Sequence, residues 1–328
     1  MKLLVTGGLG FIGSNFILKV LQEKDIHVIN VDAELYGSDH RNLTEIQNSE
    51  RYDFVKGNIS NKKLMEEIIS KSDMVVNFAA ESHVDRSIND ANPFLVSNIR
   101  GAFTLLDIIT KQKKRMIHIS TDEVFGSLSD GTADENSKFN PSSPYAATKA
   151  SAELLINSYS KTFDSDVIIT RCTNNFGPRQ FLEKLIPKII TLANKNLKIP
   201  IYGNGKNIRD WIFVNDHCNA VELAMVKGKS GESYNISAGN EVDNLTIVRE
   251  ILKIMNKSED LIEYVEDRPG HDFRYSMTSE KISNELNWKI ETSLNEGLQK
   301  TVEWYLENPQ ILDNLNETVL EPTPWKNN

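Results

Sequence analysis

The stretch Lys2-Leu-Leu-Val-Thr-Gly-Gly-Leu-Gly-Phe-Ile-Gly13 is a short apolar run that leads directly into a glycine-rich turn. Apolar residues then recur at helical spacing from Phe11 to Lys24, and a second apolar run, 26–31, ends at Asp32. Strand, glycine turn, helix, strand and acid is the order that a dinucleotide-binding unit requires. The sequence therefore predicts a parallel βαβ unit with a dinucleotide at the glycine turn.

Each glycine of the turn has a separate task in this interpretation. Gly7 permits a tight turn, Gly10 lets the backbone approach a pyrophosphate, and Gly13 lets the helix pack on the strand. The free N–H groups and the positive dipole of the helix N-terminus attract the phosphates. Asp32 is placed to bind the ribose hydroxyls, which favours NAD over NADP. A purely structural turn is the alternative, but the complete βαβ context favours cofactor binding.

Strand and helix patterns continue to alternate after this unit. Short apolar runs with strand character occupy 52–56, 73–78, 116–119 and 167–170, and helical patterns occupy 62–71, 92–113 and 146–163. Repeated βα units predict an α/β fold with a doubly wound parallel Rossmann sheet. Ligands bind beyond the carboxyl ends of such strands. The residues expected at that edge are Gly7, Asp32, Asn58, Ala79, Ser120 and Cys172.

The pattern becomes richer in loops after Arg171, which indicates a second, smaller lobe. We expect an NAD-binding domain over 1–171 with a returning segment at about 212–240. The ranges 172–211 and 241–308 are expected to form an interleaved C-terminal α/β substrate lobe. Residues 309–328 are polar and contain proline, so we expect a loosely ordered tail.

Composition excludes several classes of partner. The 328 residues include 37 basic and 46 acidic side chains, and the net charge of −9 disfavours nucleic acid and anionic membranes. No apolar run is long enough to span a membrane, and no secretory pattern follows Met1. Cys172 and Cys218 have no metal-site or disulfide spacing, so we expect free thiols, no metal and a cytoplasmic location.

Tyr145 and Lys149 are four residues apart in a helical pattern, so their side chains share one face. Tyrosine is a poor base at neutral pH, because its ordinary pKa is about 10. An ammonium group nearby would lower the pKa of Tyr145 and make it a usable general base toward a hydroxyl. An exposed helix pair is the alternative, but the position after the fifth strand of a dinucleotide fold favours catalysis.

Two carboxylates follow the fifth predicted strand in the stretch Ser120-Thr-Asp-Glu123. Asp122 and Glu123 are adjacent, so their side chains diverge and can address neighbouring substrate atoms from different directions. A helix cap or an Asx-turn would explain one carboxylate at the start of a loop. Two of them beside two hydroxyls, at the ligand edge of the sheet, favour a function in proton transfer.

These motifs together resemble the nucleotide-sugar 4,6-dehydratases of the extended short-chain dehydrogenase/reductase superfamily, most closely the branch that acts on dTDP-glucose. The similarity covers about residues 1–308. Besides the glycine turn and Tyr145-x-x-x-Lys149, it rests on the blocks Phe78–Ser87, Ser120–Gly126, Arg171–Gly177, Phe181–Pro187, Arg209–His217 and Asp267–Asp272. Related epimerases share the glycine turn and the Tyr/Lys pair, but usually have small residues in place of Asp122 and Glu123.

The resemblance implies a lyase that forms a 4-keto-6-deoxy sugar. Tyr145 would remove the proton of the 4-hydroxyl while hydride passes from C4 to NAD, and Thr121 would help to hold the 4-oxygen. Glu123 would remove the C5 proton, and Asp122 would protonate the departing 6-hydroxyl. NADH would then return the hydride to C6, so that the cofactor stays tightly bound and is regenerated in every turnover.

The resemblance also implies the binding residues and a homodimer formed by the helices near 92–113 and 145–163. The implied cofactor-binding residues are Gly7, Gly10, Phe11, Ile12, Gly13, Asp32, Asn58, Ile59, Ala79, Ala80, Ser82, Asn98, Tyr145, Lys149 and Asn174. The implied substrate-binding residues are Ser82, His83, Thr121, Asn175, Glu183, Lys184, Arg209, Asn244, Arg268 and His271. Arg209 and Arg268 are candidates for the diphosphate, because guanidinium groups bind phosphate oxygens well.

Some residues depart from the family pattern. Asn58 replaces an aspartate, Phe125 and Phe176 replace tyrosines, and Arg179 occupies an often aromatic position where a cation could alter nucleotide preference. The polar loop 130–134 could serve as a lid. A 4-epimerase, a decarboxylase or another nucleotide-sugar dehydratase on the same scaffold stays open, as does a cofactor-binding protein without catalysis, which the intact catalytic residues disfavour.

Overall fold

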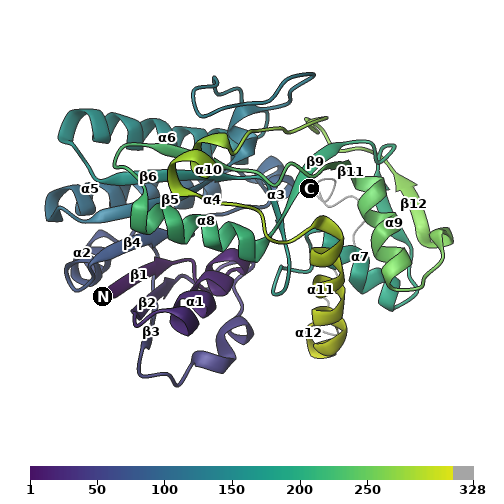
Figure 1. The fold of residues 1–328 in the computed structure, drawn as a ribbon, viewed down its shortest axis with the longest axis horizontal. Helices are drawn as coiled ribbons and strands as arrows, with labels where there is room; N and C mark the ends of the chain where they lie inside the picture. The colour runs from purple at the N-terminus through teal and green to yellow at the C-terminus, as the bar shows by residue number, and fades with distance from the viewer. Residues whose placement is uncertain (313–328) are drawn as a thin grey trace.

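A seven-stranded parallel sheet forms the centre of the larger lobe (Figure 1), in a computed structural model that describes residues 1–312. The strand order is β10-β6-β5-β4-β1-β2-β3, so the chain reverses direction across the sheet between β1 and β4. This order confirms the predicted doubly wound fold, whose ligand site lies where the order reverses. The strands are β1 Lys2–Thr6, β2 His27–Asp32, β3 Tyr52–Lys56, β4 Met74–Asn77, β5 Arg115–Thr121, β6 Val167–Cys172 and β10 Ser233–Ile236.

Helices cover both faces of this sheet because its strands are apolar on both sides. In β1, Leu3 and Val5 pack into one core and Leu4 into the other, as the two-residue period of a strand requires. Helices α1 Phe11–Glu23, α8 Val214–Lys227 and α10 Glu280–Leu286 cover the first face. Helices α2 Lys62–Ser70, α5 Ala102–Gln112 and α6 Pro144–Phe163 cover the second.

The helix expected over 92–113 is present but contains a π-helical segment. It runs as α4 Asn92–Phe94, η2 Leu95–Gly101 and α5, with η2 in the π conformation. Such segments are rare and are found mostly at functional sites. Here Ser97 of η2 lines a cavity at the carboxyl ends of the central strands, while the neighbouring Asn98 is buried.

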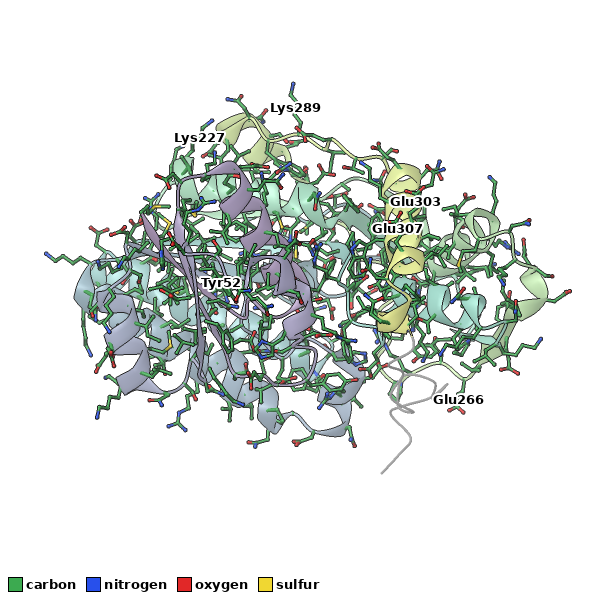
Figure 2. The ribbon with its side chains drawn as sticks, turned by 90° about the horizontal axis from the view of Figure 1, so that it is seen from below. Tyr52, Lys227, Glu266, Lys289, Glu303 and Glu307 are labelled. Carbon is green, nitrogen blue, oxygen red and sulfur yellow. The ribbon has the colours of Figure 1, made fainter. Side chains whose placement is uncertain are left out.

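The smaller lobe has its own apolar core and two small sheets. One sheet has the order β11-β9-β7 and the other pairs β12 with β8. Its strands are β7 Asn174–Phe176, β8 Ile199–Tyr202, β9 Ile208–Phe213, β11 Glu241–Asp243 and β12 Ile262–Val265, and its helices are α7 Leu185–Asn194, α9 Asn244–Ile254, α11 Leu294–Glu307 and α12 Pro309–Leu312. Figure 2 shows Glu303 and Glu307 on α11 and Glu266 at the surface of this lobe.

Two parts of the predicted organisation need correction. Ile282, Leu286 and Trp288 pack into the core of the large sheet, so this part of 241–308 belongs to the larger lobe. The tail is helical over Pro309–Leu312, where Leu312 is buried and adds apolar contact to the smaller lobe. The rest of the predicted tail, 313–328, lies outside the described residues. The division of the chain into domains otherwise stays a prediction.

Besides α12, four short helices within residues 1–312 were not predicted: η1 His40–Ile46, α3 Val84–Asn89, η3 Asp122–Phe125 and η4 Glu259–Leu261. The polar loop that includes 130–134 is joined by hydrogen bonds to the segment 274–278. Leu128 N donates to Arg274 O at 3.0 Å and Ala133 N to Ser276 O at 3.0 Å. Within residues 1–312, no helix combines the length and apolar character needed to cross a bilayer.

Candidate active site

One cavity opens at the carboxyl ends of β1, β2, β4, β5 and β6, where the sequence predicts the ligand site. Loops that follow these strands converge there because parallel strands all end at the same edge. Most predicted site residues line it. They are Gly7, Gly10, Phe11, Ile12, Gly13, Asp32, Asn58, Ile59, Ala79, Ala80, Ser82, His83, Thr121, Asp122, Glu123, Tyr145, Lys149, Asn174, Asn175 and Lys184.

The glycine turn leaves no room for side chains. A Cβ on Gly7, whose φ is +72°, would lie 2.6 Å from the Ala79 nitrogen, and one on Gly13 would lie 2.4 Å from the Gly7 oxygen. Helix α1 starts directly after Gly10, and no side chain among residues 1–312 caps its N-terminus. The bare backbone and the uncapped N–H groups fit a pyrophosphate, as the predicted NAD requires.

Asp32 holds the turn in place from the end of β2. Its carboxylate accepts hydrogen bonds from Leu9 N at 3.0 Å, Glu34 N at 2.9 Å and Ser38 Oγ at 2.8 Å. The side chain is buried and lines the cavity next to the loop that follows β2. Asp32 therefore lies where the ribose of a dinucleotide is expected, and it also fixes the shape of the glycine turn.

Asn98 differs from the other predicted cofactor residues because it does not line the cavity. Its Oδ1 accepts from Glu81 N at 2.9 Å, and its Nδ2 donates to Glu81 O at 3.0 Å and Thr148 Oγ1 at 3.0 Å. These bonds use both ends of the amide. The structure therefore corrects its role to that of a support for the loop 79–83, whose residues do line the cavity.

The carboxylate pair lies just past β5, which continues through Thr121 and not only to Ile119 as predicted. Thr121 caps the short helix η3, since its Oγ1 accepts from Glu123 N at 3.3 Å and donates to Asp122 Oδ1 at 3.1 Å. The cap is therefore a hydroxyl. Neither carboxylate therefore caps this helix, which was the alternative explanation for a carboxylate at this position.

Asp122 and Glu123 are held in surroundings that favour their protonated forms. Burial, followed by the neighbouring charge of Glu123, raises the pKa of Asp122 to about 8. Burial also raises the pKa of Glu123, but the positive charges of Arg268 and Arg209 oppose that rise. Asp122 Oδ2 and Glu123 Oε2 are buried and have no hydrogen-bond partner within the described chain. Both oxygens are therefore available to a substrate.

Tyr145 and Lys149 lie on the first two turns of α6 and line the cavity. The predicted lowering of the Tyr145 pKa by Lys149 is wrong for this structure. Burial, followed by the charge of Glu123, raises the pKa of Tyr145 well above 10. The lysine Nζ instead donates to the Ile119 carbonyl at 2.6 Å, and burial lowers the pKa of Lys149 to about 8.

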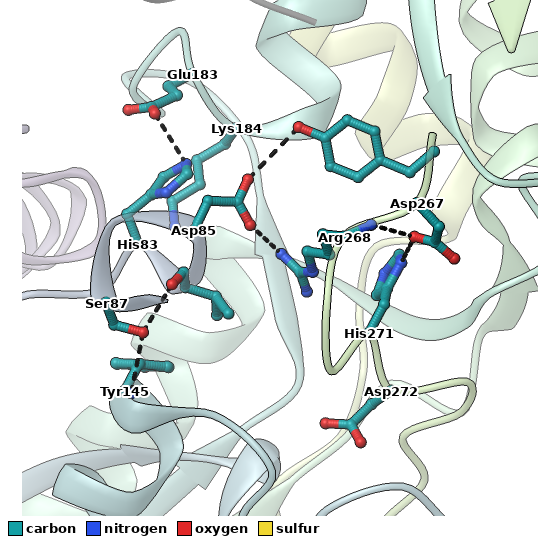
Figure 3. A network of polar contacts seen from close by, with 12 residues as sticks. His83, Asp85, Ser87, Tyr145, Glu183, Lys184, Asp267, Arg268, His271 and Asp272 are labelled. Carbon is teal, nitrogen blue, oxygen red and sulfur yellow. Dashed lines mark hydrogen bonds and ion pairs between the residues drawn. The ribbon is translucent and has the colours of Figure 1, made fainter. Parts of the chain in front are cut away.

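Six predicted residues do not line the cavity. Besides Asn98, they are Glu183, Arg209, Asn244, Arg268 and His271. Arg209 donates to Asp272 O at 2.9 Å, and its guanidinium lies 4.3 Å from the centre of the Tyr275 ring. Arg268 pairs with Asp85 at 2.7 Å and His271 with Asp267 at 2.6 Å (Figure 3). The arginines nevertheless lie close enough for their charges to act on Glu123.

The remaining two of these residues lie at the edges of the smaller lobe. Glu183 accepts a hydrogen bond from Tyr36 and lies 3.3 Å from His83 Nε2. Asn244 begins α9, and its buried Oδ1 has no hydrogen-bond partner among residues 1–312.

Arg179 does not reach the cavity, which corrects the expectation that it alters nucleotide preference. Its guanidinium binds Glu45 at 2.9 Å, the Asn42 carbonyl at 3.2 Å and Asn15 Oδ1 at 3.3 Å. It also lies 5.6 Å from the centre of the Trp304 ring. These contacts join the smaller lobe to α1 and η1, so the role of Arg179 is structural.

Several cavity residues were missed at the level of sequence. Tyr36 and Phe181 line the cavity with their rings 4.9 Å apart, and the Arg86 guanidinium lies 3.6 Å from the centre of the Tyr36 ring. The position of Tyr36, just past β2, could have identified it by the rule that also identifies Asp32. No sequence pattern identifies Phe181 as a cavity residue. Its loop reaches Tyr36 only because the two lobes pack against each other.

A doubly wound sheet with a bare glycine turn, a buried Tyr/Lys pair and strand-end carboxylates defines a dinucleotide-dependent enzyme of the short-chain dehydrogenase/reductase class. The model of the GDP-mannose 4,6 dehydratase family matches residues 4–301, and the chain belongs to this family. In the part of the chain that the structure describes, no group of three or more His, Cys, Asp or Glu side chains is placed to hold a metal.

Individual relatives agree with this assignment. The chain is 46% identical to the low-salt glycan biosynthesis protein Agl12 of Haloferax volcanii, over 93% of this chain and 99% of the relative. It is 42% identical to the dTDP-glucose 4,6-dehydratase of Streptomyces niveus, over 94% of each. The NAD-bound structure of the dTDP-glucose 4,6-dehydratase of Streptomyces venezuelae superposes with a TM-score of 0.93 at 40% identity, covering 94% of this chain and 98% of that one.

Proposed function

We propose that this chain is an NAD-dependent hydro-lyase that converts dTDP-glucose to dTDP-4-keto-6-deoxyglucose. The observation that carries the proposal is the pair of buried Asp122 and half-buried Glu123, which line the same cavity as Tyr145 and the glycine turn. Elimination of water needs an acid and a base at neighbouring carbons, and hydride transfer needs a dinucleotide. A 4-epimerase would need only the dinucleotide and the tyrosine.

The cavity would hold NAD through the turn at Gly7, Gly10 and Gly13, the N-terminus of α1, and Asp32 and Asn58, which are the candidates for the adenosine end. Phe11, Ile12, Ile59, Ala79, Ala80, Ser82 and Asn174 complete this set. When bound, NAD would supply the acceptor for the hydride from C4 of the sugar and the donor for its return to C6. Lys149 is placed to hold the nicotinamide ribose, and its pKa of about 8 keeps it a cation at pH 7.

Tyr145 takes the proton of the 4-hydroxyl, and Thr121 holds the same oxygen. Both side chains are buried at the cavity wall. Burial raises the pKa of Tyr145, so its phenol is protonated at neutral pH when no substrate is being oxidised. The phenol must therefore give up its own proton to solvent before it can accept that of the 4-hydroxyl, and the cationic nicotinamide of bound NAD and the Lys149 ammonium would favour the phenolate form.

Asp122 and Glu123 take opposite roles because their surroundings differ. With a pKa of about 8, Asp122 is a neutral acid at pH 7 and can protonate the departing 6-hydroxyl. Burial raises the pKa of Glu123 as well, but the charges of Arg268 and Arg209 oppose that rise, and such neighbouring cations assist a base that removes the C5 proton. A ketone at C4 makes this proton acidic, so the oxidation must come first.

The diphosphate binds beside Glu123, where Lys184, Arg209 and Arg268 gather positive charge. All three act electrostatically on Glu123. Lys184 lines the cavity, and its Nζ donates to Ser82 O at 2.9 Å. The residues proposed to surround the substrate at a greater distance from Glu123 are Ser82, His83, Asn175, Glu183, Asn244 and His271. Arginine suits this site because its planar fork matches phosphate oxygens.

The active form is a homodimer in the cytoplasm. Leu95, Phe103, Leu154 and Phe163 are exposed large apolar side chains on η2, α5 and α6, and helices α5 and α6 pack side by side. A patch of this kind marks an interaction surface. Both cysteines are buried free thiols, in keeping with a reducing compartment. A Phe103→Glu/Leu154→Glu variant should run as a monomer in light scattering, and a dimer would exclude this surface.

Incubation with a panel of nucleotide sugars tests the activity. dTDP-glucose, UDP-glucose and GDP-mannose are each given to the purified chain, and the products are identified by mass spectrometry and NMR. We expect loss of one water from dTDP-glucose and a 4-keto-6-deoxy product. A C4 epimer or a pentose would instead support the epimerase or decarboxylase alternative. The Glu123→Gln variant, which should retain NAD but not turn over, is the matched control.

A further inference from the structure

The short helix α3, Val84–Asn89, contacts both the start of α6 and the smaller lobe (Figure 3). On one side, Ser87 Oγ accepts a hydrogen bond from Tyr145 N at 3.2 Å. On the other, Asp85 pairs with Arg268. Tyr145 N is one of the N–H groups that a helix start leaves without an intrahelical partner. One six-residue helix therefore fixes the backbone of the catalytic tyrosine and a cation of the smaller lobe.

Asp85 makes its contacts across a long distance in the chain. Its Oδ1 accepts from Arg268 Nη1 at 2.7 Å, a pairing over 183 residues, and its Oδ2 lies 3.5 Å from the Tyr202 hydroxyl. The carboxylate is buried, with 5% of the residue exposed. A buried, charge-assisted hydrogen bond of this kind holds its partner firmly, because loss of the carboxylate would leave a buried charge without compensation.

Arg268 keeps part of its guanidinium available. An arginine has five N–H donors in a rigid fork, and Asp85 engages Nη1. The Nε atom is buried and has no hydrogen-bond partner anywhere in residues 1–312. Burial has the largest effect on the pKa of Glu123 and raises it. The charge of Arg268 has the next largest effect and lowers this pKa. A buried N–H donor therefore belongs to a cation that lies within electrostatic range of the carboxylate that we propose as the base.

We propose that Asp85 is a positioning residue, which fixes one arm of the Arg268 guanidinium and so keeps its Nε edge available to the anionic part of the substrate. The identity of that substrate as a nucleoside diphosphate sugar rests on the proposed function. Since α3 also holds Tyr145 N through Ser87, this helix fixes the distance between the diphosphate site at Arg268 and the reacting sugar carbon at Tyr145.

Binding of dTDP and UDP to the NAD-loaded full chain tests this role, because neither ligand has a sugar that can react. Calorimetry compares the wild type with Asp85→Asn, Arg268→Gln and the double variant. We expect Asp85→Asn to raise the Kd of the better ligand at least about tenfold, since it leaves a buried charge without its partner. The double variant should bind no more weakly than Arg268→Gln alone, because Asp85 acts through Arg268.

Asp90→Asn is the matched control, since it makes the same isosteric change at the exposed C-terminal end of α3. It should leave the Kd unchanged. In turnover, Asp85→Asn should raise KM more than it lowers kcat, and its NAD content should equal that of the wild type. If Asp85→Asn does not fold, Asp85→Glu replaces it, because the longer side chain keeps the charge but displaces the guanidinium.

An unchanged Kd in the Asp85 variant, or losses that add in the double variant, would overturn the positioning role. Failure of the proposed function is a separate result. A wild type that binds dTDP or UDP but converts no nucleotide sugar refutes the reaction, and the Asp85–Arg268 coupling is still measured by binding. A wild type that binds neither ligand overturns both.

Discussion

Replacing Asp122 with asparagine should stabilise the folded chain at neutral pH while it abolishes dehydration. The pKa of the carboxyl rises from 3.8 to about 8 on folding, chiefly through burial. Above pH 3.8 the unfolded chain therefore releases a proton that the folded chain keeps, and the free energy of unfolding falls as the pH rises, until the folded carboxyl ionises near pH 8. Asparagine is nearly isosteric and does not titrate.

The size of this gain follows from the pKa shift. From pH 3.8 to pH 7 is 3.2 units, and at about 1.36 kcal/mol per unit the difference is about 4 kcal/mol. Entry of water around the ionised group reduces such a value, so we expect a gain of about 2–4 kcal/mol at pH 7 and none near pH 4. Thr121 can still donate to the asparagine oxygen.

Urea unfolding of both proteins at saturating NAD, from pH 4 to pH 8, measures the gain. The two curves of unfolding free energy against pH should meet at the acid end and separate steadily toward neutrality. A gap that does not depend on pH, or a variant less stable than the wild type at pH 7, would show that Asp122 is not held as a neutral acid. Exposed Asp130, changed to asparagine, is the control and should produce no gap.

Three further perturbations address the cofactor, the tyrosine helix and the buried ion pair. Gly13→Ala places a Cβ 2.4 Å from the Gly7 oxygen, so the purified protein should contain about tenfold less NAD, measured by absorbance. An unchanged NAD content would show that the glycine turn does not bind the cofactor. Lys149→Met should lower kcat by about 100-fold or more, and the wild-type rate should decline above pH 8 as Lys149 loses its proton. Glu153→Gln leaves the Arg171 guanidinium, whose side chain is 2% exposed, without its ion-pair partner, and should lower the free energy of unfolding in urea by about 3–5 kcal/mol. An unchanged unfolding midpoint would contradict a stabilising role of this ion pair.

Local patterns were sufficient for most of the larger lobe. The apolar runs, the glycine turn and Asp32 predicted β1, α1 and β2, because the strand period and the turn geometry depend on neighbouring residues. The rule that ligands bind at the carboxyl ends of parallel strands then placed Thr121, Asp122 and Glu123 in one cavity with the glycine turn.

Features that depend on distant contacts were not predicted. The pairing of Asp85 with Arg268 spans 183 residues, and no local pattern in either segment predicts this contact. The sign of the Tyr145 pKa shift was wrong because the i, i+4 spacing reveals the lysine but not the burial or the neighbouring Glu123. For Arg179 we expected an influence on nucleotide preference, and nothing in the sequence indicated its partner Glu45, which lies 134 residues away.

In the proposed reaction, one hydride leaves C4 and returns to C6 while Glu123 exchanges the proton at C5. Turnover of dTDP-glucose labelled with deuterium at C4, followed by NMR of the product, tests it most directly. We expect the deuterium to appear at C6, and we expect unlabelled substrate turned over in deuterated water to gain deuterium at C5. Deuterium that stays at C4 of a recovered hexose, or is lost to the solvent, would contradict it.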